Sequence, residues 1–288
     1  MAIKARKQFG QHWLRDEQVL QQIVAAAELC NTDCVLEIGP GTGILTRRLL
    51  PLVKSLLAVE LDRDLCQLLT RTLGQHLNFL LLQGDFLSLD LGSLLQEYPL
   101  FQDPNKVVAN IPYNITGPIL ERLLGTIAKP QPCPYQTIVL LVQKEVAERL
   151  CARPGSKVYG ALSVRVQYLA ACELICSVPA KSFSPPPQVD SAVIRLRPRR
   201  FELAAADPVL LQRLVTLGFA TRRKMLRNNL KGEIERDHLS QLLAQLDIPT
   251  TARAEDLSPR QWVMLSNCWS TGSSGSFGGQ GMLEADGL

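Results

Sequence analysis

The chain has 288 residues, which is enough for one large domain and a smaller one, each with its own hydrophobic core. Of its residues 46% are hydrophobic and 20% are charged, as is typical of a globular protein. No apolar run approaches the roughly 18 residues of a membrane helix. The basic N-terminus continues into polar residues without the apolar segment of a secretory signal, so we expect a cytoplasmic protein that spans no membrane.

Residues 35 to 142 alternate between short apolar runs and segments with helical spacing, the pattern of βα units with a parallel sheet, and two more β-rich runs follow before residue 200. Strands are expected at 35–38, 55–59, 78–82, 106–109, 137–142, 174–178 and 192–196. Helices are expected at 44–50, 62–73, from about 116, at 144–151 and at 161–168, with a loop at 153–157. The first 200 residues are therefore predicted to form one α/β domain.

After Arg200 the pattern changes, because only helical spacing recurs. Helices are expected at 209–219, 226–230, 238–246 and 259–268. We predict a small all-helical domain over 201–269, followed by a disordered tail over 270–288 that is rich in glycine and serine at its start.

Eight cysteines are present, and two pairs among them are separated by three residues instead of the two that are usual in zinc knuckles. No histidine pair accompanies them. Most lie in apolar runs, so we expect reduced, partly buried thiols and neither a metal site nor a disulfide. The eight are Cys30, Cys34, Cys66, Cys133, Cys151, Cys172, Cys176 and Cys268.

The net charge of +4 is modest, but the basic residues cluster in three blocks that no acidic residue interrupts. Such blocks are often only solvated faces, yet three in one chain favour a polyanionic partner. The blocks are Lys4, Arg6 and Lys7; Arg195, Arg197, Arg199 and Arg200; and Arg222, Arg223, Lys224, Arg227 and Lys231.

Four positions follow consecutive predicted strands, where open α/β sheets bind their ligands. The turn Gly39-Pro-Gly-Thr-Gly43 has glycines at alternate positions, unlike the dinucleotide motif G-x-G-x-x-G, and suits close approach of a ligand to the backbone. Glu60 can accept both hydroxyls of a ribose, and Asp85 can accept from an adenine amino group. With Asn110, these positions predict an adenosine-type cofactor.

The stretch Asn110-Ile-Pro-Tyr113 suits the capture of a flat ring that carries an amine. The amide oxygen of Asn110 and a neighbouring backbone carbonyl can accept hydrogen bonds from an exocyclic NH2, while the ring stacks on Tyr113. A turn with a helix cap is the simpler interpretation of these four residues taken alone.

These motifs together resemble those of class I S-adenosylmethionine-dependent methyltransferases that act on adenine N6. Three flanking stretches resemble the KsgA/RsmA ribosomal RNA adenine dimethyltransferases in particular, and the resemblance covers residues 4 to 269. The stretches are Arg6-Lys-Gln-Phe-Gly-Gln-His-Trp-Leu14, Ser182-Phe-Ser-Pro-Pro-Pro-Gln-Val-Asp-Ser-Ala192 and Arg222-Arg-Lys-Met-Leu-Arg-Asn228.

The resemblance implies a Rossmann-like sheet and dimethylation of two adjacent adenosines in a hairpin loop near the 3′ end of small-subunit rRNA. It implies S-adenosylmethionine contacts from His12, Leu14, Gly39, Glu60, Asp85 and Asn110. Asparagine is common at the position of His12, and threonine at that of Gly117, so this chain departs from the pattern at both. We expect a monomer that binds small-subunit rRNA in pre-ribosomal particles.

In this interpretation Asn110, Tyr113 and Phe183 act on the target adenine, with Phe183 as a second plate opposite Tyr113. Phe183 could equally be a core aromatic beside a proline-rich turn. The residues expected to bind RNA are Arg195, Arg197, Arg222, Arg223, Lys224 and Arg227.

Two other functions fit parts of the sequence. One is an adenine-N6 methyltransferase acting on large-subunit rRNA or on DNA, although a DNA enzyme usually carries a larger target-recognition domain. The other is a ribosome-assembly or transcription factor that keeps the fold without turnover. The intact stretch from Asn110 to Tyr113 argues against the second, because a scaffold has no use for an amide that orients an amine.

Overall fold

The computed structural model describes residue 6, residues 10–132 and residues 135–273, the last three without their side chains. The chain divides into two compact units. The first contains the described residues up to Thr126, together with Pro130–Ala152 and Val166–Arg200; the second contains Ile127–Lys129, Arg153–Arg165 and the described residues from Phe201.

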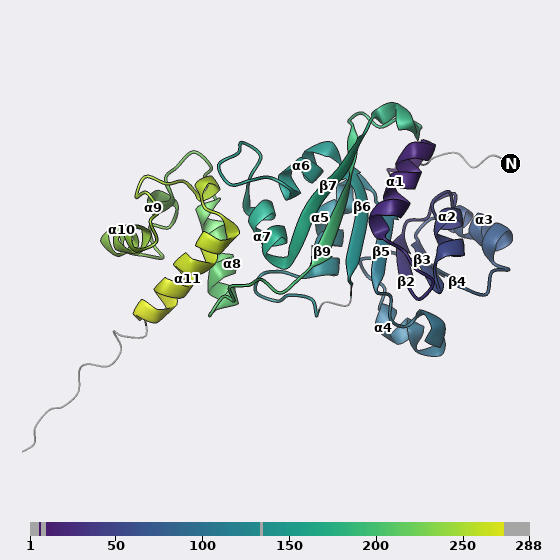
Figure 1. Cartoon of the computed structure of the whole chain (residues 1–288), viewed down its shortest axis with the longest axis horizontal. Helices are drawn as coiled ribbons and strands as arrows, with labels where there is room; N and C mark the ends of the chain where they lie inside the picture. Colours follow the sequence, from purple (N-terminus) through teal and green to yellow (C-terminus); the bar gives the residue numbers. More distant parts are fainter. Residues whose placement is uncertain (1–5, 7–9, 133–134, 274–288) are drawn as a thin grey trace, which may run out of the picture. The chain divides into compact units, whose positions relative to one another are not determined.

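The first unit is built on a seven-stranded sheet of order β4-β3-β2-β5-β6-β9-β7 (Figure 1). The strands from β4 to β6 run parallel, and β9 pairs antiparallel with both of its neighbours. The strands are β2 (Cys34–Ile38), β3 (Ser55–Glu60), β4 (Phe79–Gln83), β5 (Lys106–Asn110), β6 (Thr137–Gln143), β7 (Ala170–Val178) and β9 (Ser191–Pro198). The mostly parallel sheet with covering helices confirms the expected Rossmann-like fold class.

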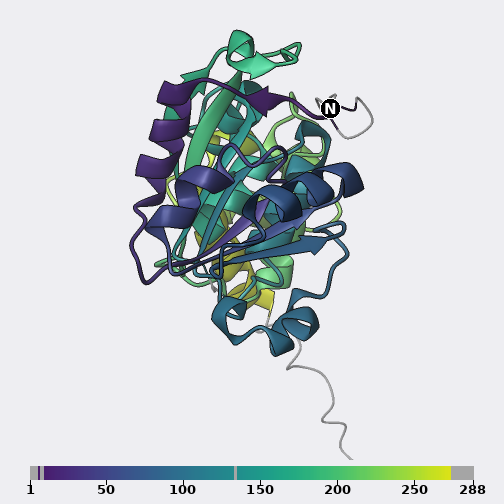
Figure 2. The ribbon, with the colours of Figure 1, turned by 90° about the vertical axis from the view of Figure 1, so that its right-hand side faces the viewer.

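Helices cover the sheet, and the central strands are consequently apolar along nearly their whole length. All six residues of β3 are buried, as are the first six of β6. Helix α1 packs against β5, β6, β7 and β9, and runs along one side of the sheet in Figure 2. The helices are α1 (Glu17–Ala27), α2 (Thr46–Leu49), α3 (Arg63–Leu73), α4 (Leu91–Leu94), α5 (Thr116–Leu124), α6 (Lys144–Leu150) and α7 (Ala161–Leu169), with 3₁₀ turns at Leu50–Leu52, Leu95–Glu97, Pro99–Phe101, Tyr113–Ile115 and Ala180–Ser182.

Three features of the first unit were not predicted from the sequence. They are α1, the helical turns between 91 and 101, and a two-stranded ribbon of β1 (Trp13–Leu14) and β8 (Phe183–Ser184). Helix α1 carried a local signal, because Asp16 caps it and its buried residues recur at helical spacing. Two-residue strands carry no such signal, since their pairing partners lie far away in the sequence.

The second unit is helical where the structure describes it, with isolated β-bridges as its only extended pairs. Its helices after residue 200 are α8 (Pro208–Gly218), α9 (Leu226–Asn229), α10 (Arg236–Gln245) and α11 (Pro259–Ser273), with a 3₁₀ turn at Ala254–Asp256. Trp262 is fully buried, and the Tyr159 hydroxyl donates to the carbonyl of Leu257 at 3.0 Å. Helix α11 includes residues 270–273, which were expected to belong to the tail; residues 274–288 lie outside the described part.

Within the described ranges, no helix combines the length and the apolarity that crossing a membrane would require. The cysteines differ in exposure. Cys30 is exposed, Cys66 is buried, and five others are half-buried, whereas Cys133 lies outside the described residues. Burial raises the pKa of the Cys172 thiol to about 12 and that of Cys66 to about 11, which disfavours the reactive thiolate.

An ion pair is buried at the amino ends of the parallel strands. The ammonium of Lys106 lies 2.9 Å from a carboxylate oxygen of Asp33, and both side chains are less than a tenth exposed. Asp33 also accepts from the side chain of Asn105 and from the backbone N–H of Cys30. Burial raises the pKa of Asp33, but the hydrogen bonds from Lys106 and Asn105 outweigh it, and the pKa lies below its ordinary value.

Replacing Asp33 by alanine should destabilise the protein by about 3–5 kcal/mol, because the ammonium of Lys106 would be left buried without its counter-ion. The measurement is urea unfolding followed by circular dichroism. Asp103→Ala, at an exposed position shortly before β5, is the control and should change the free energy of unfolding by less than about 0.5 kcal/mol. Equal effects of the two variants would contradict this role of the ion pair.

Candidate functional site

Parallel pairing brings the ends of four strands together at one edge of the sheet. The backbone N–H of Gly39 donates to the carbonyl of Val59 at 2.9 Å, and that of Gly84 donates to Glu60 at 2.8 Å. Because the strand order is β4-β3-β2-β5, the positions lie in the spatial order Asp85, Glu60, Gly39, Asn110. The four positions predicted from the sequence therefore form one row along the edge of the sheet.

The turn between β2 and α2 requires glycine. Gly39, Gly41 and Gly43 have φ of +68°, +62° and +78°, in the left-handed region that other residues rarely adopt. At Gly43 a Cβ would come within 2.9 Å of Leu69 Cδ2, so the Leu69 side chain would have to shift to admit it. The turn exposes bare backbone to the cavity beside it.

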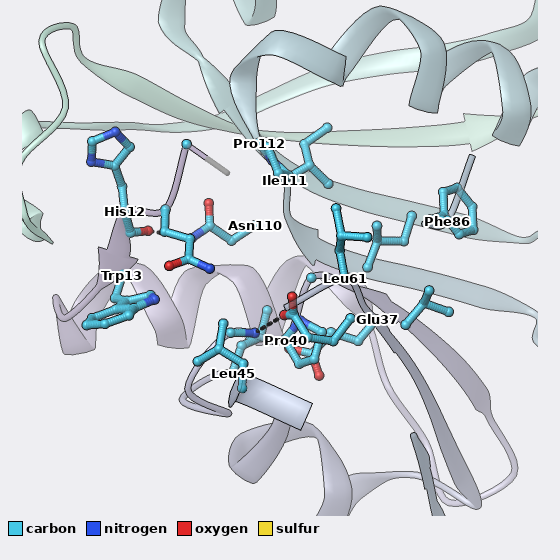
Figure 3. A pocket seen from close by; sticks show the side chains of 18 of the residues that line it. His12, Trp13, Glu37, Pro40, Leu45, Leu61, Phe86, Asn110, Ile111 and Pro112 are labelled. Atoms are coloured by element: carbon cyan, nitrogen blue, oxygen red, sulfur yellow. Dashed lines mark hydrogen bonds between the residues drawn. The ribbon is translucent and has the colours of Figure 1, made fainter. Parts of the chain in front are cut away.

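The carboxylate of Glu60 is buried and is held by backbone groups on both sides. One oxygen accepts from the N–H of Gly41 at 3.0 Å, and the other accepts from the N–H of Asp62 at 2.9 Å (Figure 3 shows the pocket). Burial raises the pKa of Glu60 above its ordinary value. A carboxylate has about four lone-pair sites, so Glu60 can still accept a hydrogen bond from a diol.

The segment after β4 is held in place by Arg122 of α5. The guanidinium lies 4.9 Å from the ring centroid of Phe86 and donates to the carbonyls of Leu87 and Leu89. Phe86 is buried and lines the pocket, whereas its neighbour Asp85 is exposed. This arrangement places a carboxylate and an aromatic wall side by side.

The amide of Asn110 has a defined orientation. Its Nδ2 donates to the backbone carbonyl of His12 at 3.2 Å, which leaves Oδ1 as a free acceptor. The residue is half-buried at the end of β5 and lines the pocket.

Tyr113 is positioned by contacts at both ends of its side chain. Its hydroxyl lies 2.6 Å from the hydroxyl of Ser191, which is fully buried on β9. Its ring is nearly parallel to that of His12, with centroids 6.0 Å apart and an interplanar angle of 15°. Burial raises the pKa of the Tyr113 phenol, so the hydroxyl is protonated at neutral pH.

The N-terminal segment is fastened to the region around residue 183. Trp13 and Leu14 pair antiparallel with Ser184 and Phe183, and His12 Nδ1 lies 2.8 Å from the carbonyl of Pro185. Leu14 and Phe183 are both buried in the hydrophobic core. The structure thus places Phe183 in the core and outside the pocket wall, and brings His12 next to Tyr113.

The pocket lies wholly within the first unit and unites all six residues that were expected to contact the cofactor, together with Tyr113. Other residues that line the pocket were not predicted from the sequence, although Leu61 and Phe86 each directly follow a predicted strand-end acid. Trp13, Glu37, Leu61 and Phe86 are among them.

Glu37 is fully buried at the base of this pocket. Its Oε2 has no hydrogen-bond partner among the described residues. Burial raises its pKa to about 8, and the nearby charge of Glu60 acts in the same direction. Glu37 is therefore mostly protonated at neutral pH in the ligand-free protein.

The arginines of β9 are paired with carboxylates. Arg195 is 13% exposed and contacts Glu28 at 2.7 Å and Glu173 at 2.5 Å, and these contacts raise the pKa of its guanidinium further. Arg197 contacts the same two carboxylates at 2.8 and 3.8 Å. Both guanidinium groups thus connect β9 to Glu28, at the end of α1, and to Glu173 of β7.

The basic residues that follow α8 are placed differently. Arg222, Arg223 and Lys224 are exposed on a turn that the side chain of Asn229 holds through the carbonyls of Gly218 and Thr221. Arg222 has a carboxylate 3.9 Å away, and Arg227 is half-buried. This turn presents three cations to solvent.

Comparisons with known proteins agree with the geometry. The model of the family described as ribosomal RNA adenine dimethylase matches residues 2–270. A protein of Nostoc punctiforme named ribosomal RNA small subunit methyltransferase A is 66% identical over 271 residues, which cover 92% of this chain and 95% of that protein.

Two crystal structures are similar to the fold. A dimethyladenosine transferase from Plasmodium falciparum has a TM-score of 0.75 at 27% identity, covering 91% of this chain and 98% of that one. The 23S rRNA methyltransferase ErmE has a TM-score of 0.70 at 29% identity, covering 88% and 97%.

The burial of Glu37 predicts a pH dependence of stability. Its pKa is about 8 in the folded protein against an ordinary 4.5, so the folded state binds this proton more tightly than the unfolded state. Its contribution is fully present below about pH 4.5 and is lost as the pH rises to about 8, by about 1.4 kcal/mol per pH unit.

Glu37→Gln should remove this loss and be more stable than the original protein at about pH 8. Chemical unfolding of the ligand-free protein across the pH range measures the effect. Glu97→Gln, at an exposed position, is the control and should keep the original dependence. A Glu37→Gln profile parallel to that of the original protein would refute the raised pKa.

Proposed function

Because this chain belongs to the ribosomal RNA adenine dimethylase family, we propose that it transfers methyl groups from S-adenosylmethionine to N6 of two adjacent adenosines. The substrate is a hairpin loop near the 3′ end of small-subunit rRNA, and the product is N6,N6-dimethyladenosine. We place the reaction in the cytoplasm, during ribosome assembly. The observation that carries the proposal is the free acceptor of Asn110 beside the ring of Tyr113, at the end of the acceptor row.

The pocket fits a nucleoside cofactor. Its glycine turn leaves room where side chains would intrude, and its acceptors lie where hydroxyl and amino groups need partners. Glu60 would hold the ribose hydroxyls with its remaining lone pairs, and Asp85 would accept from the adenine amine beside Phe86. When bound, S-adenosylmethionine supplies an electrophilic methyl group on its sulfonium.

Asn110 prepares the target amine for transfer. The lone pair of adenine N6 is delocalised into the ring and has to be turned towards the methyl group. Asn110 Oδ1 accepts one N6 hydrogen, because Nδ2 is already engaged by His12. The carbonyl of Ile111 or Pro112 accepts the other, and the proton leaves to water after the transfer. Orientation of this kind can supply several kcal/mol without a general base.

The ring plane of the target is set by Tyr113. Its hydroxyl is anchored on Ser191, so the ring is held before the base arrives, and the target adenine can stack on it. Phe183 is buried in the hydrophobic core against which Tyr113 packs, so we assign it the role of supporting the Tyr113 ring. After the first transfer only one N6 hydrogen remains, so the monomethylated amine rotates or rebinds before the second.

The RNA is an unpaired loop, because taking a base out of a stack costs a few kcal/mol and is cheapest there. We assign the phosphate contacts to Arg222, Arg223 and Lys224, with Arg227 beside them. Arg195 and Arg197 are left out of this assignment, since their guanidinium groups are engaged by Glu28 and Glu173.

The function is tested by incubating the protein with labelled S-adenosylmethionine and, in separate reactions, with small and with large ribosomal subunits that lack the modification. Mass spectrometry should then find N6,N6-dimethyladenosine at two adjacent positions near the 3′ end of the RNA. Label in large-subunit rRNA alone would support the alternative substrate, and binding of the subunit without any transfer would support an assembly factor.

Asn110→Ala should lower the rate of methyl transfer in this assay by about a hundredfold or more, as expected for a group that acts in the transition state. Binding of S-adenosylmethionine, measured by calorimetry, should change little. Asn31→Ala, at an exposed position, is the control and should methylate at the original rate. Turnover by Asn110→Ala close to that of the control would disprove the role of the amide.

Replacing Arg222, Arg223 and Lys224 together by alanine should make RNA affinity less dependent on salt. The negative slope of log K against log salt should become shallower by about 2, at roughly 0.7 for each lost phosphate contact. The control removes the same charge from exposed positions of the first unit, by changing Lys54, Arg63 and Arg71 to alanine. If both triple variants change the slope equally, net charge and not this turn determines the affinity.

A further inference from the structure

Trp13 belongs to the pocket wall. It lies on β1, and a Cβ at Gly41 would be 3.6 Å from its Cδ1 and 3.7 Å from its Nε1. The pyrrole edge of the indole therefore packs on the glycine turn. Figure 3 shows this edge, with the nitrogen, facing the interior of the pocket.

The indole N–H of Trp13 is buried and has no hydrogen-bond partner among the described residues. A buried tryptophan normally finds an acceptor for this group, because leaving it unpaired costs free energy comparable to a lost hydrogen bond. A donor of this kind, aimed into a ligand pocket, indicates that the ligand brings the acceptor.

The charged residues of the pocket indicate which acceptor group of a ligand would depend on this N–H donor. Its described lining contains three carboxylates, Glu37, Glu60 and Asp85, and no lysine or arginine. A carboxylate on the ligand would therefore find no lysine or arginine among these residues, and a neutral N–H donor of the wall is free to meet it. Gln11 is engaged, because its Nε2 donates to Asp62 at 3.0 Å.

The position of Trp13 agrees with this chemistry. Glu60 and Asp85 follow β3 and β4, at one end of the row, whereas Trp13 packs on the turn after β2, towards Asn110. A nucleoside whose ribose and base lie at the first end extends its amino-acid end towards the second. That end of S-adenosylmethionine carries its only carboxylate.

We propose that the indole N–H of Trp13 donates a hydrogen bond to the carboxylate of the bound cofactor and thereby selects ligands that carry this group. The inference rests on the proposed function for the identity of the cofactor. Trp13 acts here as a binding residue for the part of the cofactor that does not react. Loss of its N–H should therefore lower the affinity for the cofactor without changing the position of the methyl group that is transferred.

The test is a cycle of two ligands and two proteins, measured by isothermal titration calorimetry. The ligands are S-adenosylmethionine and its decarboxylated analogue, which keeps the sulfonium and the amine. Trp13→Phe keeps an aromatic ring on Gly41 and removes the N–H. The variant should bind S-adenosylmethionine about tenfold more weakly, as expected for one hydrogen bond to a charged group, and the analogue within about twofold of the original protein.

Equal weakening for both ligands would overturn the proposal, because it would make Trp13 a packing residue only, and so would no weakening for either. Failure of the original protein to bind S-adenosylmethionine would instead refute the cofactor assignment itself. Trp262→Phe is the matched control. Its indole N–H is likewise buried and without a partner among the described residues, but it lies in the core of the helical unit, and both affinities should stay unchanged.

Discussion

The parallel hydrogen bonding of β4, β3, β2 and β5 is the interaction on which the site depends. It aligns the carboxyl ends of four strands, so that Gly39, Glu60, Asp85 and Asn110 lie along one edge of the sheet. Parallel strands of this kind are stable only when both faces are covered, which the helices of the first unit achieve. The polar side chains can therefore appear only where the strands end, and this places carboxylates, glycine turn and amide in a single row.

A second constraint acts at the Asn110 end of this row. The short ribbon of β1 and β8 joins positions that are far apart in the sequence, Trp13 with Ser184 and Leu14 with Phe183. It brings the carbonyl of His12 to the amide of Asn110, and that contact decides which end of the amide is free to accept. The amide of Asn110, at the end of β5, is thus oriented by a segment that belongs to neither neighbouring strand.

The described lining of the pocket contains carboxylates and no lysine or arginine, unlike that of most anion-binding sites. Glu37 and Glu60 lie close enough for the charge of Glu60 to affect Glu37, and burial raises the pKa of both. This environment favours a ligand that brings positive charge, as a sulfonium with an amine does. The basic residues lie elsewhere, on the turn after α8, where they remain solvated. The acidic pocket and this exposed basic turn consequently lie in different parts of the chain.

The sequence by itself determined the strands, the glycine turn and the row of strand-end acceptors, because apolar runs and the glycine requirement are local properties. The family followed from motifs such as Asn110-Ile-Pro-Tyr113 and was confirmed by the comparisons. Only the tertiary structure decided which side chains face the pocket. Trp13 lines it and Phe183 enters the core, and Arg195 is engaged by Glu28 and Glu173. These outcomes depend on pairings between distant segments, which local patterns do not encode.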